Sequence, residues 1–444
     1  MKIIIAGAGE VGTHLAKMLS NEDQDIILLD SDQARLDVID ANYNLMTWNG
    51  STSSFDAMKS VDVEHADLYI AVTPFETRNI TSCAIAKQLG AKRTVARIDN
   101  FEFLKEENKK VLTNLGVDVL IYPENVGATE IDTALDHNWA RYWGALADDN
   151  LLLIGIKLHD NSPLINVKLK DLPVTTHDFH VCAIKRKSET IIPNGNDEIR
   201  ADDIVYFITT PEYVEEVRDL CGKRKRSIRK VLIMGGSRIA VRFALQYHDK
   251  YHIKIIEMNR ERCEELATRL PDCEIVHGDG RDIEVLRENI IYQYDAFLAL
   301  TDSSETNILS CLTAKEFGVP KTIADVENLQ FISQAENLNI GTTINKKLLA
   351  SSHIFQILLD SDRSNTKCMV LADAEVAEIE VKPKAKITKS PVKNLKLPYG
   401  MTLAGLIRGG EASLVDGNTH LLPGDYVVVF CLAGNIHKIE KWFS

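Results

Sequence analysis

A glycine-rich loop near the start of the chain has the spacing of a site for the phosphates of a dinucleotide. The loop consists of Gly7, Ala8, Gly9, Glu10, Val11 and Gly12. In such a loop the first glycine permits a tight turn, the second lets a pyrophosphate approach the backbone, and the third lets a helix pack on the preceding strand. The N-terminus of that helix would add N–H groups and the positive end of its dipole. We therefore predict a nucleotide phosphate site here.

An acidic residue at the end of the next apolar run extends this pattern. Asp30 follows Ile26–Leu29, near the spacing from Gly12 at which a carboxylate accepts hydrogen bonds from ribose hydroxyls. The same carboxylate would repel a 2′-phosphate. We therefore expect NAD(H), with ADP or ATP as alternatives, and disfavour NADP.

Residues at or just after the ends of later apolar runs fit the same site. They are Ser51, Thr52, Thr73, Pro74 and Arg97. Ser51 and Thr52 suit a loop beside the adenine, and Thr73 lies where the carboxyl edge of a parallel sheet would open. The sequence leaves two interpretations of Arg97: it contacts a phosphate, or it pairs with a neighbouring acid.

The chain repeats these features about 228 residues later, which indicates two copies of a whole two-part domain rather than a solenoid. The second loop consists of Gly235, Gly236, Ser237, Arg238, Ile239 and Ala240. Ser237 replaces the second glycine, and its side chain narrows the approach of a phosphate. Arg238 replaces Glu10, so a terminal γ-phosphate is disfavoured at the first site and favoured at the second.

The partners of the second loop are only partly retained. Glu257 ends a strand as Asp30 does, Asp279 lies in the loop that corresponds to Ser51, and Thr301 repeats Thr73. Asp325, however, stands in the place of Arg97, which exchanges a cation for an anion. The sequence leaves open whether the second site binds a nucleotide.

Short apolar strands that alternate with helical patterns predict an α/β fold with a parallel sheet and right-handed crossovers. The strands predicted in the first copy are Ile3–Ala6, Ile26–Leu29, Leu45–Thr47, Leu68–Val72, Thr94–Arg97 and Val119–Ile121. A helix over Thr129–Trp143 is expected to leave the sheet and to serve as a hinge. After it we expect strands at Leu152–Lys157, Phe179–Lys185 and Ile204–Thr209, and a helix at Pro211–Cys221.

We thus predict two Rossmann-like, doubly wound parallel sheets, each followed by a small α+β module. The expected boundaries are 1–140 and 141–222 for the first sheet and module, and 229–360 and 367–444 for the second pair. The basic run Lys223–Lys230 joins the halves. It is either a solvated linker or a contact with acidic lipid headgroups.

Composition limits the class of protein. A net charge of −13 argues against a nucleic-acid partner. No apolar run approaches the roughly 18 residues of a transmembrane helix, and a strand begins at the second residue with no signal-peptide pattern before it. The eight cysteines lack zinc-site spacing, so we expect buried, reduced thiols and a cytoplasmic location. Scattered acids are expected to be solvated rather than to bind a metal, although a calcium or magnesium site at a subunit interface stays an alternative.

The sequence resembles the RCK/KTN family, which regulates potassium channels and transporters, in the tandem form that serves Trk potassium uptake. The matching segments are Ile5–Gly12, Ala66–Thr73, Ala96-Arg97 and Leu421–Val427. The resemblance implies a homo-oligomer, expected to be a tetramer, that forms a ring on the inner face of the plasma membrane. It also implies NAD(H) or adenine nucleotides as ligands and a multi-span Trk-type membrane subunit as partner. Asn49, Ser237 and Asp325 depart from the family pattern.

Two other functions are alternatives to this one. An NAD-dependent oxidoreductase needs an acid or base beside the nicotinamide, and the histidines of the small modules share no spacing between the halves. We therefore expect no catalytic residue and no enzyme activity. A free-standing cytosolic nucleotide sensor without a membrane partner is the second alternative.

Overall fold

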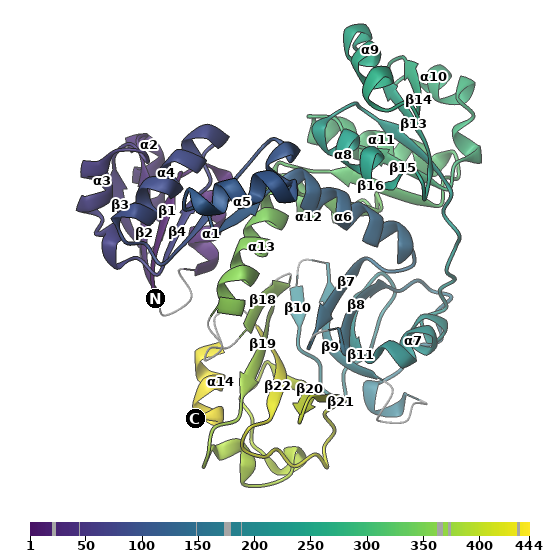
Figure 1. Cartoon of the computed structure of the whole chain (residues 1–444). Helices are drawn as coiled ribbons and strands as arrows, with labels where there is room; N and C mark the ends of the chain where they lie inside the picture. Colours follow the sequence, from purple (N-terminus) through teal and green to yellow (C-terminus); the bar gives the residue numbers. More distant parts are fainter. Residues whose placement is uncertain are drawn as a thin grey trace. The chain divides into compact units, whose positions relative to one another are not determined.

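The fold was analysed in a computed structural model, which describes residues 1–19, 24–43, 45–147, 149–172, 179–187, 189–361, 367–371, 374–432 and 436–444. Figure 1 shows the chain coloured along its sequence. The chain forms two compact units that do not follow its order. The first unit comprises Met1–Glu130, Ser237–Gln246 and Ile344–Leu358. The second comprises Ile131–Gly236, Tyr247–Thr343 and Leu359–Ser444. Two helical segments from the second half of the sequence thus belong to the first unit.

The first sheet is parallel and has the strand order β3-β2-β1-β4-β5-β6. Its strands are β1 (Lys2–Ala6), β2 (Asp25–Asp30), β3 (Met46–Asn49), β4 (Leu68–Ala71), β5 (Arg93–Arg97) and β6 (Val119–Ile121). Its helices are α1 (Glu10–Leu19), α2 (Gln33–Asp40), α3 (Phe55–Ser60), α4 (Glu76–Leu89), α5 (Glu106–Asn114) and α6 (Pro123–Asp136). The order reverses between β1 and β4, which is where doubly wound sheets bind ligands.

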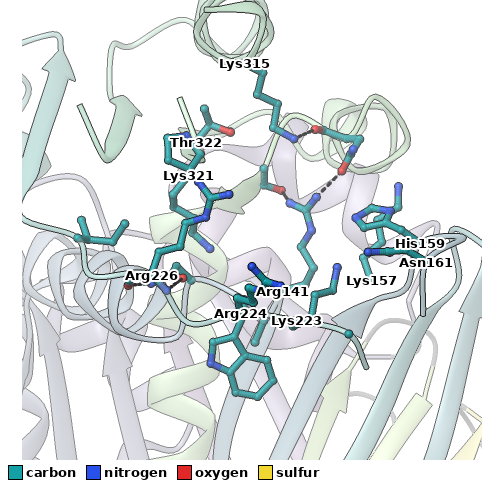
Figure 2. A pocket seen from close by; sticks show the side chains of 18 residues that line it. Arg141, Lys157, His159, Asn161, Lys223, Arg224, Arg226, Lys315, Lys321 and Thr322 are labelled. Carbon is teal, nitrogen blue, oxygen red and sulfur yellow. Dashed lines mark hydrogen bonds between the residues drawn. The ribbon is translucent and has the colours of Figure 1, made fainter. Parts of the chain in front are cut away.

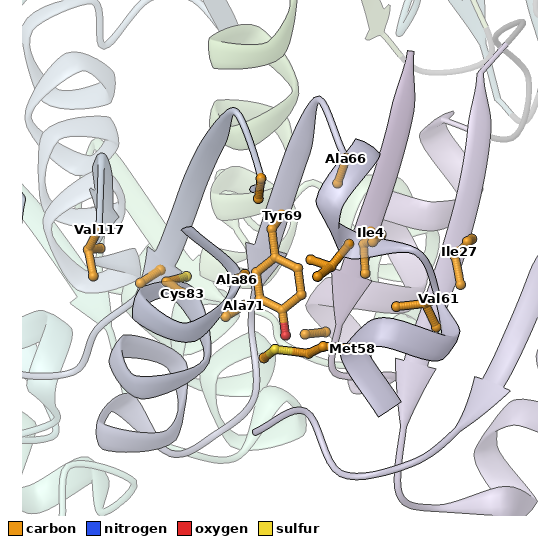
Figure 3. Close-up of a cluster of buried hydrophobic side chains, with 14 of the residues drawn as sticks. Ile4, Ile27, Met58, Val61, Ala66, Tyr69, Ala71, Cys83, Ala86 and Val117 are labelled. Atoms are coloured by element: carbon orange, nitrogen blue, oxygen red, sulfur yellow. The ribbon is translucent and has the colours of Figure 1, made fainter. Parts of the chain in front are cut away.

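The apolar strands of this sheet are buried beneath the helices that pack on it. All four residues of β4 are buried, as expected for a parallel strand that is covered on both faces. Tyr69 of β4 lies in the core cluster with Ile4, Met58 and Cys83 (Figure 3). Its hydroxyl donates to the carbonyl oxygen of Thr52 at 3.0 Å, so the core also fixes the loop that follows β3.

The second sheet has the equivalent order β14-β13-β12-β15-β16-β17. Its strands are β12 (Lys230–Met234), β13 (His252–Glu257), β14 (Glu274–His277), β15 (Ala296–Ala299), β16 (Lys321–Asp325) and β17 (Thr342–Ile344). The helices of this half are α8 (Arg238–Tyr247), α9 (Arg260–Arg269), α10 (Ile283–Glu288), α11 (Ser304–Glu316), α12 (Leu329–Asn337) and α13 (Lys346–Ser361), of which α8 and α13 belong largely to the first compact unit. The duplicated Rossmann-like fold that the sequence predicts is confirmed.

Each small module contains a five-stranded antiparallel sheet, in the orders β10-β9-β11-β8-β7 and β18-β19-β22-β20-β21. The first module comprises β7 (Tyr142–Leu146), β8 (Leu151–Lys157), β9 (Phe179–Arg186), β10 (Glu189–Ile191), β11 (Ile204–Thr209) and α7 (Val214–Leu220). The second comprises β18 (Lys367–Leu371), β19 (Ala374–Glu380), β20 (Met401–Arg408), β21 (Glu411–Leu414), β22 (Tyr426–Leu432) and α14 (Ile436–Phe443). One core cluster joins the two sheets and includes Leu153, Tyr206, Val428 and Phe430.

An ion pair between an arginine and a buried carboxylate recurs in both modules. Arg186 donates to both carboxylate oxygens of Asp203 at 2.9 and 2.7 Å, and Arg408 does the same to Asp425 at 2.8 and 2.7 Å. Burial acts to raise the pKa of Asp425, but the hydrogen bonds from Arg408 and the Leu422 N–H outweigh it and hold the pKa below its ordinary value. These pairs are part of the module framework.

The predicted helix over Thr129–Trp143 is wrong at its C-terminal end. Helix α6 ends at Asp136, and Tyr142–Leu146 is strand β7, which pairs with β8. Aromatic residues favour strands, and the Trp143 ring stacks on His137, with the ring centroids 3.6 Å apart. The predicted helix at Pro211–Cys221 is instead a 3₁₀ turn over Pro211–Tyr213 followed by α7.

Two further features concern the cysteines and the helices. Six of the seven cysteines that the structure describes are buried free thiols, and the side chain of Cys368 lies outside the described residues. No helix in the described ranges is both long enough and apolar enough to cross a membrane.

Candidate nucleotide-binding site

The three glycines of the first loop differ in what their backbone tolerates. Gly7 has φ +117°, and an added Cβ would lie 3.0 Å from the amide nitrogen of Thr73. An added Cβ at Gly12 would lie only 1.9 Å from the carbonyl oxygen of Gly7. At Gly9 such an atom would have no neighbour within 4 Å. The outer two glycines thus serve the turn and its packing, and the space beside Gly9 is open.

The Asp30 carboxylate is anchored to this loop. Its Oδ2 accepts from the Ala8 N–H at 2.6 Å, and its Oδ1 accepts from the Asp32 N–H at 2.8 Å. Asp30 is the last residue of β2, so the parallel register of β1 and β2 brings it beside the loop. A carboxylate offers about four lone-pair positions, which leaves capacity for ribose hydroxyls.

An asparagine clamp holds the end of β4 against the end of β5. Asn79 accepts from the Thr73 N–H at 3.0 Å and from its hydroxyl at 2.6 Å. Its amide donates to the carbonyl oxygens of Thr73 and Arg97, both at 2.9 Å. Pro74 lies exposed directly after this clamp. The Thr73 hydroxyl is therefore engaged in shaping the edge of the sheet.

Arg97 shows one of the two interactions that the sequence left open, the pair with an acid, and its contact with a phosphate stays a prediction. Its Nη2 lies 3.3 Å from Asp99, so it pairs with a neighbouring acid. Its Nε is buried and has no hydrogen-bond partner among the described residues. A buried guanidinium nitrogen without a partner is costly, so a ligand oxygen at this place would satisfy it.

The loop after β3 offers polar atoms of two kinds. Ser51 is exposed, with its hydroxyl 3.3 Å from that of Ser53. Thr52 is buried, and its Oγ1 has no partner in the part of the chain that the structure describes. Asn49 donates to the carbonyl oxygen of Ser31 at 3.3 Å. These residues lie at the carboxyl ends of β2 and β3, at the same edge of the sheet as Asp30.

The second half reproduces the anchoring contacts. Glu257 accepts from the Gly236 N–H at 2.7 Å and from the Asn259 N–H at 2.8 Å, as Asp30 does in the first half. Asn307 accepts from the Thr301 N–H at 3.0 Å and donates to the carbonyl oxygen of Asp325 at 2.8 Å. The acid-and-loop arrangement is thus a repeated device.

The loop itself is less open in the second half. Ser237 places a side chain where Gly9 has none, and its buried hydroxyl has no partner among the described residues. Ile239 is buried at the start of α8. Asp279 is already paired with Arg281 at 2.7 Å, and these hydrogen bonds hold the pKa of Asp279 below its ordinary value.

Two ion pairs of opposite polarity lie beside the loop helices. Glu10 at the start of α1 pairs with Lys347 of α13. Arg238 at the start of α8 lies 3.0 Å from the fully buried Glu124 of α6 and 3.7 Å from Asp99. Glu10 corresponds to Arg238 in the repeat. Each loop residue therefore meets a helix from the other half of the sequence that carries the opposite charge.

Further contacts dock these helices within the first compact unit. Arg242 of α8 lies over the Phe101 ring, 3.7 Å from its centroid, and donates to Asn125 of α6 at 2.8 Å. Gly127 permits the close approach of Ile239, because an added Cβ there would lie 2.6 Å from it. Helix α13 is held to α1 by the Ser351 hydroxyl, which donates to the Val11 carbonyl oxygen at 3.2 Å.

Several of these residues were not predicted from the sequence. Asn79 and Asn307 recur at the constant offset of the repeat, so a signal was present. Lys347 and Glu124 lie far in sequence from the loops that they contact, and no local pattern marks them. Their roles depend on which helices share a compact unit.

One group of potential metal ligands occurs in the described residues, and it is exposed. It comprises Asp62, Glu64 and His65. Asp62 already pairs with Lys2 at 2.5 Å and with His65 at 2.7 Å. The cluster is explained by these pairs and supports no metal site.

Comparison with known proteins agrees with this architecture. Residues 3–123 and 231–346 match the TrkA-N domain family, and residues 153–222 and 376–444 match the TrkA-C domain family. The Trk system potassium uptake protein TrkA of Vibrio alginolyticus is 30% identical over 97% of this chain and 95% of its own.

Solved structures show the same fold at low sequence identity. The GsuK RCK domain matches 100% of this chain and 94% of its own with a TM-score of 0.59 and 12% identity. The GsuK channel bound to NAD matches 100% of this chain and 78% of its own with a TM-score of 0.58 and 14% identity. The tandem domains and the full-length relative together show that this chain belongs to the TrkA family.

Proposed function

We propose that this protein is a nucleotide-sensing regulatory subunit of a membrane potassium-transport system. One observation carries the proposal: each half anchors a glycine-rich loop to a strand-end carboxylate, Asp30 on Ala8 and Glu257 on Gly236. The full-length relative is named for Trk potassium uptake. The partner would be a multi-span Trk-type membrane subunit, and the protein would act from the cytoplasm, peripheral to the inner face of the plasma membrane.

The first site would bind NAD(H), or ADP or ATP, by its adenosine and phosphate groups. The open space beside Gly9 would take the pyrophosphate, the N-terminus of α1 would face it, and Asp30 would accept from the ribose. The unpartnered Nε of Arg97 offers a donor at the same edge of the sheet. A neighbour in fold, the GsuK channel, is bound to NAD.

The two sites would differ in ligand preference. Glu10 disfavours a γ-phosphate at the first site and Arg238 favours one at the second, but each is partly neutralised by its ion pair. The side chain of Ser237 narrows the second site. We therefore propose NAD(H) or ADP at the first site, with the second empty or biased towards ATP.

Coupling would pass through the helices that start at the loops. A ligand beside Gly9 would contact the N-terminus of α1, and α1 contacts α13. A ligand at the second loop would contact the N-terminus of α8, and α8 contacts α6. A ligand shifts a two-state equilibrium only through its different affinity for the two states. A tenfold difference at each of four sites would supply about 5.5 kcal/mol in total.

The proposed functional parts are residues 1–140, 141–222, 229–360 and 367–444, with the hinge near Thr129–Trp143. Chains would assemble into a homo-tetrameric ring with eight Rossmann-like units. The protein would have no enzyme activity of its own.

The test is the identity and affinity of the bound nucleotide. Mass spectrometry should find NAD(H) or an adenine nucleotide retained by the purified protein, and calorimetry should find binding that the Asp30→Ala variant weakens. The protein should co-purify with the Trk-type membrane subunit and should not oxidise NADH alone. NADH turnover by the isolated protein would favour an oxidoreductase, and nucleotide binding without any membrane partner would favour a free-standing sensor.

A further inference from the structure

A cavity of about 530 Å³ lies within the second compact unit, at the amino ends of strands β12, β16 and β17, whereas the second glycine-rich loop follows the carboxyl end of β12. Among the described residues, its lining includes seven Lys and Arg side chains and no Asp or Glu (Figure 2). Three of them, Lys223, Arg224 and Arg226, belong to the basic run that joins the halves. The others come from the first small module, from helix α11 and from strand β16. We call this space the basic cavity.

The linker is fixed where it borders the basic cavity. The Arg226 N–H donates to Asn138 Oδ1 at 3.1 Å, and the Asn138 amide donates to the Arg226 carbonyl oxygen at 2.8 Å. The two residues are far apart in sequence and hold each other by paired hydrogen bonds. The basic run is therefore part of a wall, which gives its charges defined positions.

The first half of the chain contains the place that corresponds to the edge of the basic cavity, and there a lysine is paired with a carboxylate. Lys87 near the end of α4 pairs with Asp118 at 2.8 Å, and the same carboxylate accepts from the Thr94 N–H at 2.8 Å. Asp118 immediately precedes β6. In the first half, a carboxylate thus neutralises the lysine.

The second half has lost that carboxylate and gained cations. Lys315 corresponds to Lys87, but the residue before β17 is Gly341, which has no side chain. Arg141 takes up part of the space and donates to the carbonyl oxygen of Gly341 and to Asn339. Lys315 donates to the Asn339 carbonyl oxygen. Neutral carbonyl and amide oxygens have replaced an anion at the edge of a concentrated positive charge.

Burial and neighbouring positive charges lower the pKa values of two lysines that line the basic cavity. Burial, together with the neighbouring Arg141, lowers the pKa of Lys315 to about 8. Burial and Arg141 also lower the pKa of Lys223. Of the lining cations, Lys157 has a carboxylate nearby, with its Nζ 3.2 Å from Asp202. An anion in the cavity would relieve this repulsion.

We propose that the basic cavity binds a soluble anion that carries two or three linked phosphate groups. Arginine and lysine together are the side chains that bind phosphates, and their charges here come from several directions. A volume of about 530 Å³ falls in the range of small-molecule sites and exceeds what one phosphate needs. The ligand would tie the linker and the first module to the second sheet.

The experiment titrates inorganic triphosphate into the full-length protein by calorimetry. The test variant is Lys223→Gln/Lys315→Gln, which removes one charge from each of two walls. The matched control is Lys389→Gln/Lys396→Gln, which removes two exposed charges elsewhere in the second unit. We expect the test variant to bind at least tenfold more weakly, the control to stay within twofold, and orthophosphate to bind more weakly than triphosphate.

Two outcomes would overturn the proposal. Equal triphosphate affinity of the test and control variants would place the binding elsewhere, including at the glycine-rich loops. Binding to vesicles with anionic lipid but not to triphosphate would assign the surface to a membrane. Because Lys315 is partly buried, the exposed Arg224→Gln variant repeats the test with less risk to folding, and thermal unfolding checks each protein.

Discussion

At the scale of single residues, the sequence predicted best the positions where backbone geometry requires a particular residue. Gly7 and Gly12 are required by close contacts with atoms of the chain itself. Asp30 was predicted from its spacing and its place at a strand end, and its carboxylate is hydrogen-bonded to the glycine-rich loop, while its contact with a ribose stays a prediction. The additional bond from Asp30 to the Ala8 N–H could not be predicted, because it depends on the side-chain rotamer.

Replacing Asp30 tests the ribose contact. Loss of hydrogen bonds to a charged group costs about 1.5–3 kcal/mol, so Asp30→Ala should weaken nucleotide binding by roughly tenfold to a hundredfold. Asp30→Asn keeps the shape and one acceptor oxygen and should lose less. Calorimetric titration measures both variants. If the Asp30→Ala variant binds nucleotide with wild-type affinity, Asp30 does not contact the ribose.

The glycines provide a matched pair of substitutions. Gly12→Ala places a Cβ 1.9 Å from a backbone oxygen, so we expect destabilisation of about 1–3 kcal/mol together with loss of nucleotide binding. Gly9→Ala meets nothing within 4 Å and should unfold at nearly the wild-type temperature, yet bind nucleotide more weakly. Calorimetric unfolding and titration separate the two effects. Normal binding by Gly9→Ala would show that the phosphates lie elsewhere.

At the scale of elements, the strands of the first parallel sheet were predicted well and the helix boundaries less well. Strand β4 is a short, fully buried apolar run between polar turns, which is a strong local signal. Strand β7 was missed because Tyr142–Leu146 follows a helix closely and pairs with a strand that comes later. The contacts of α8 and α13 with the first Rossmann-like domain carry no local signal.

A charge exchange tests the contact between α1 and α13. Glu10→Lys and Lys347→Glu should each destabilise the protein, because each creates a pair of like charges. The double variant should recover most of the loss. The coupling should be about 0.2–1 kcal/mol, since 61% of the Glu10 side chain is exposed. Additive effects of the two substitutions in denaturant unfolding would argue against the contact.

A histidine between the small modules should make stability depend on pH. His180 lies 2.9 Å from the Thr402 hydroxyl, and burial lowers its pKa to about 4, from an ordinary value of about 6.5. The folded state thus keeps His180 neutral. Stability should be highest above pH 6.5 and should fall as the pH drops towards 4, because the unfolded chain takes up the proton first.

The size of this effect is limited to about 3 kcal/mol, because one pKa unit corresponds to about 1.4 kcal/mol and His180 keeps some solvent exposure. His180→Gln should flatten the decline in denaturant unfolding between pH 6.5 and 4. His420→Gln, at an exposed histidine of the second module, is the control and should leave it unchanged. An unchanged decline in His180→Gln would refute the assignment.

At the scale of the whole molecule, the duplication was evident in the sequence, whereas the assignment of helices to compact units was not. The repeat fixes two sheets and two modules of the same topology. Which helices fold with which sheet depends on contacts such as those of Arg242 and Ser351 between distant segments. The basic cavity likewise depends on three segments that are distant in sequence. The sequence therefore could not show whether the basic run Lys223–Lys230 is a solvated linker or a binding surface.

Assembly is a prediction at this scale. The purified protein should form a tetramer at micromolar concentration in the presence of nucleotide, which light scattering measures. The duplicated sheets within one chain would then supply eight Rossmann-like units to the ring. A monomer under these conditions would exclude a ring and would leave the nucleotide without a way to act on several sites together.

The most direct test is potassium flux through the reconstituted Trk-type membrane subunit with this protein added and nucleotide titrated. The account predicts that nucleotide changes the flux in the presence of the wild-type protein. It also predicts that Asp30→Ala moves the midpoint to a nucleotide concentration at least about tenfold higher. Flux that does not respond to nucleotide, or that responds equally with the Asp30→Ala protein, would contradict it.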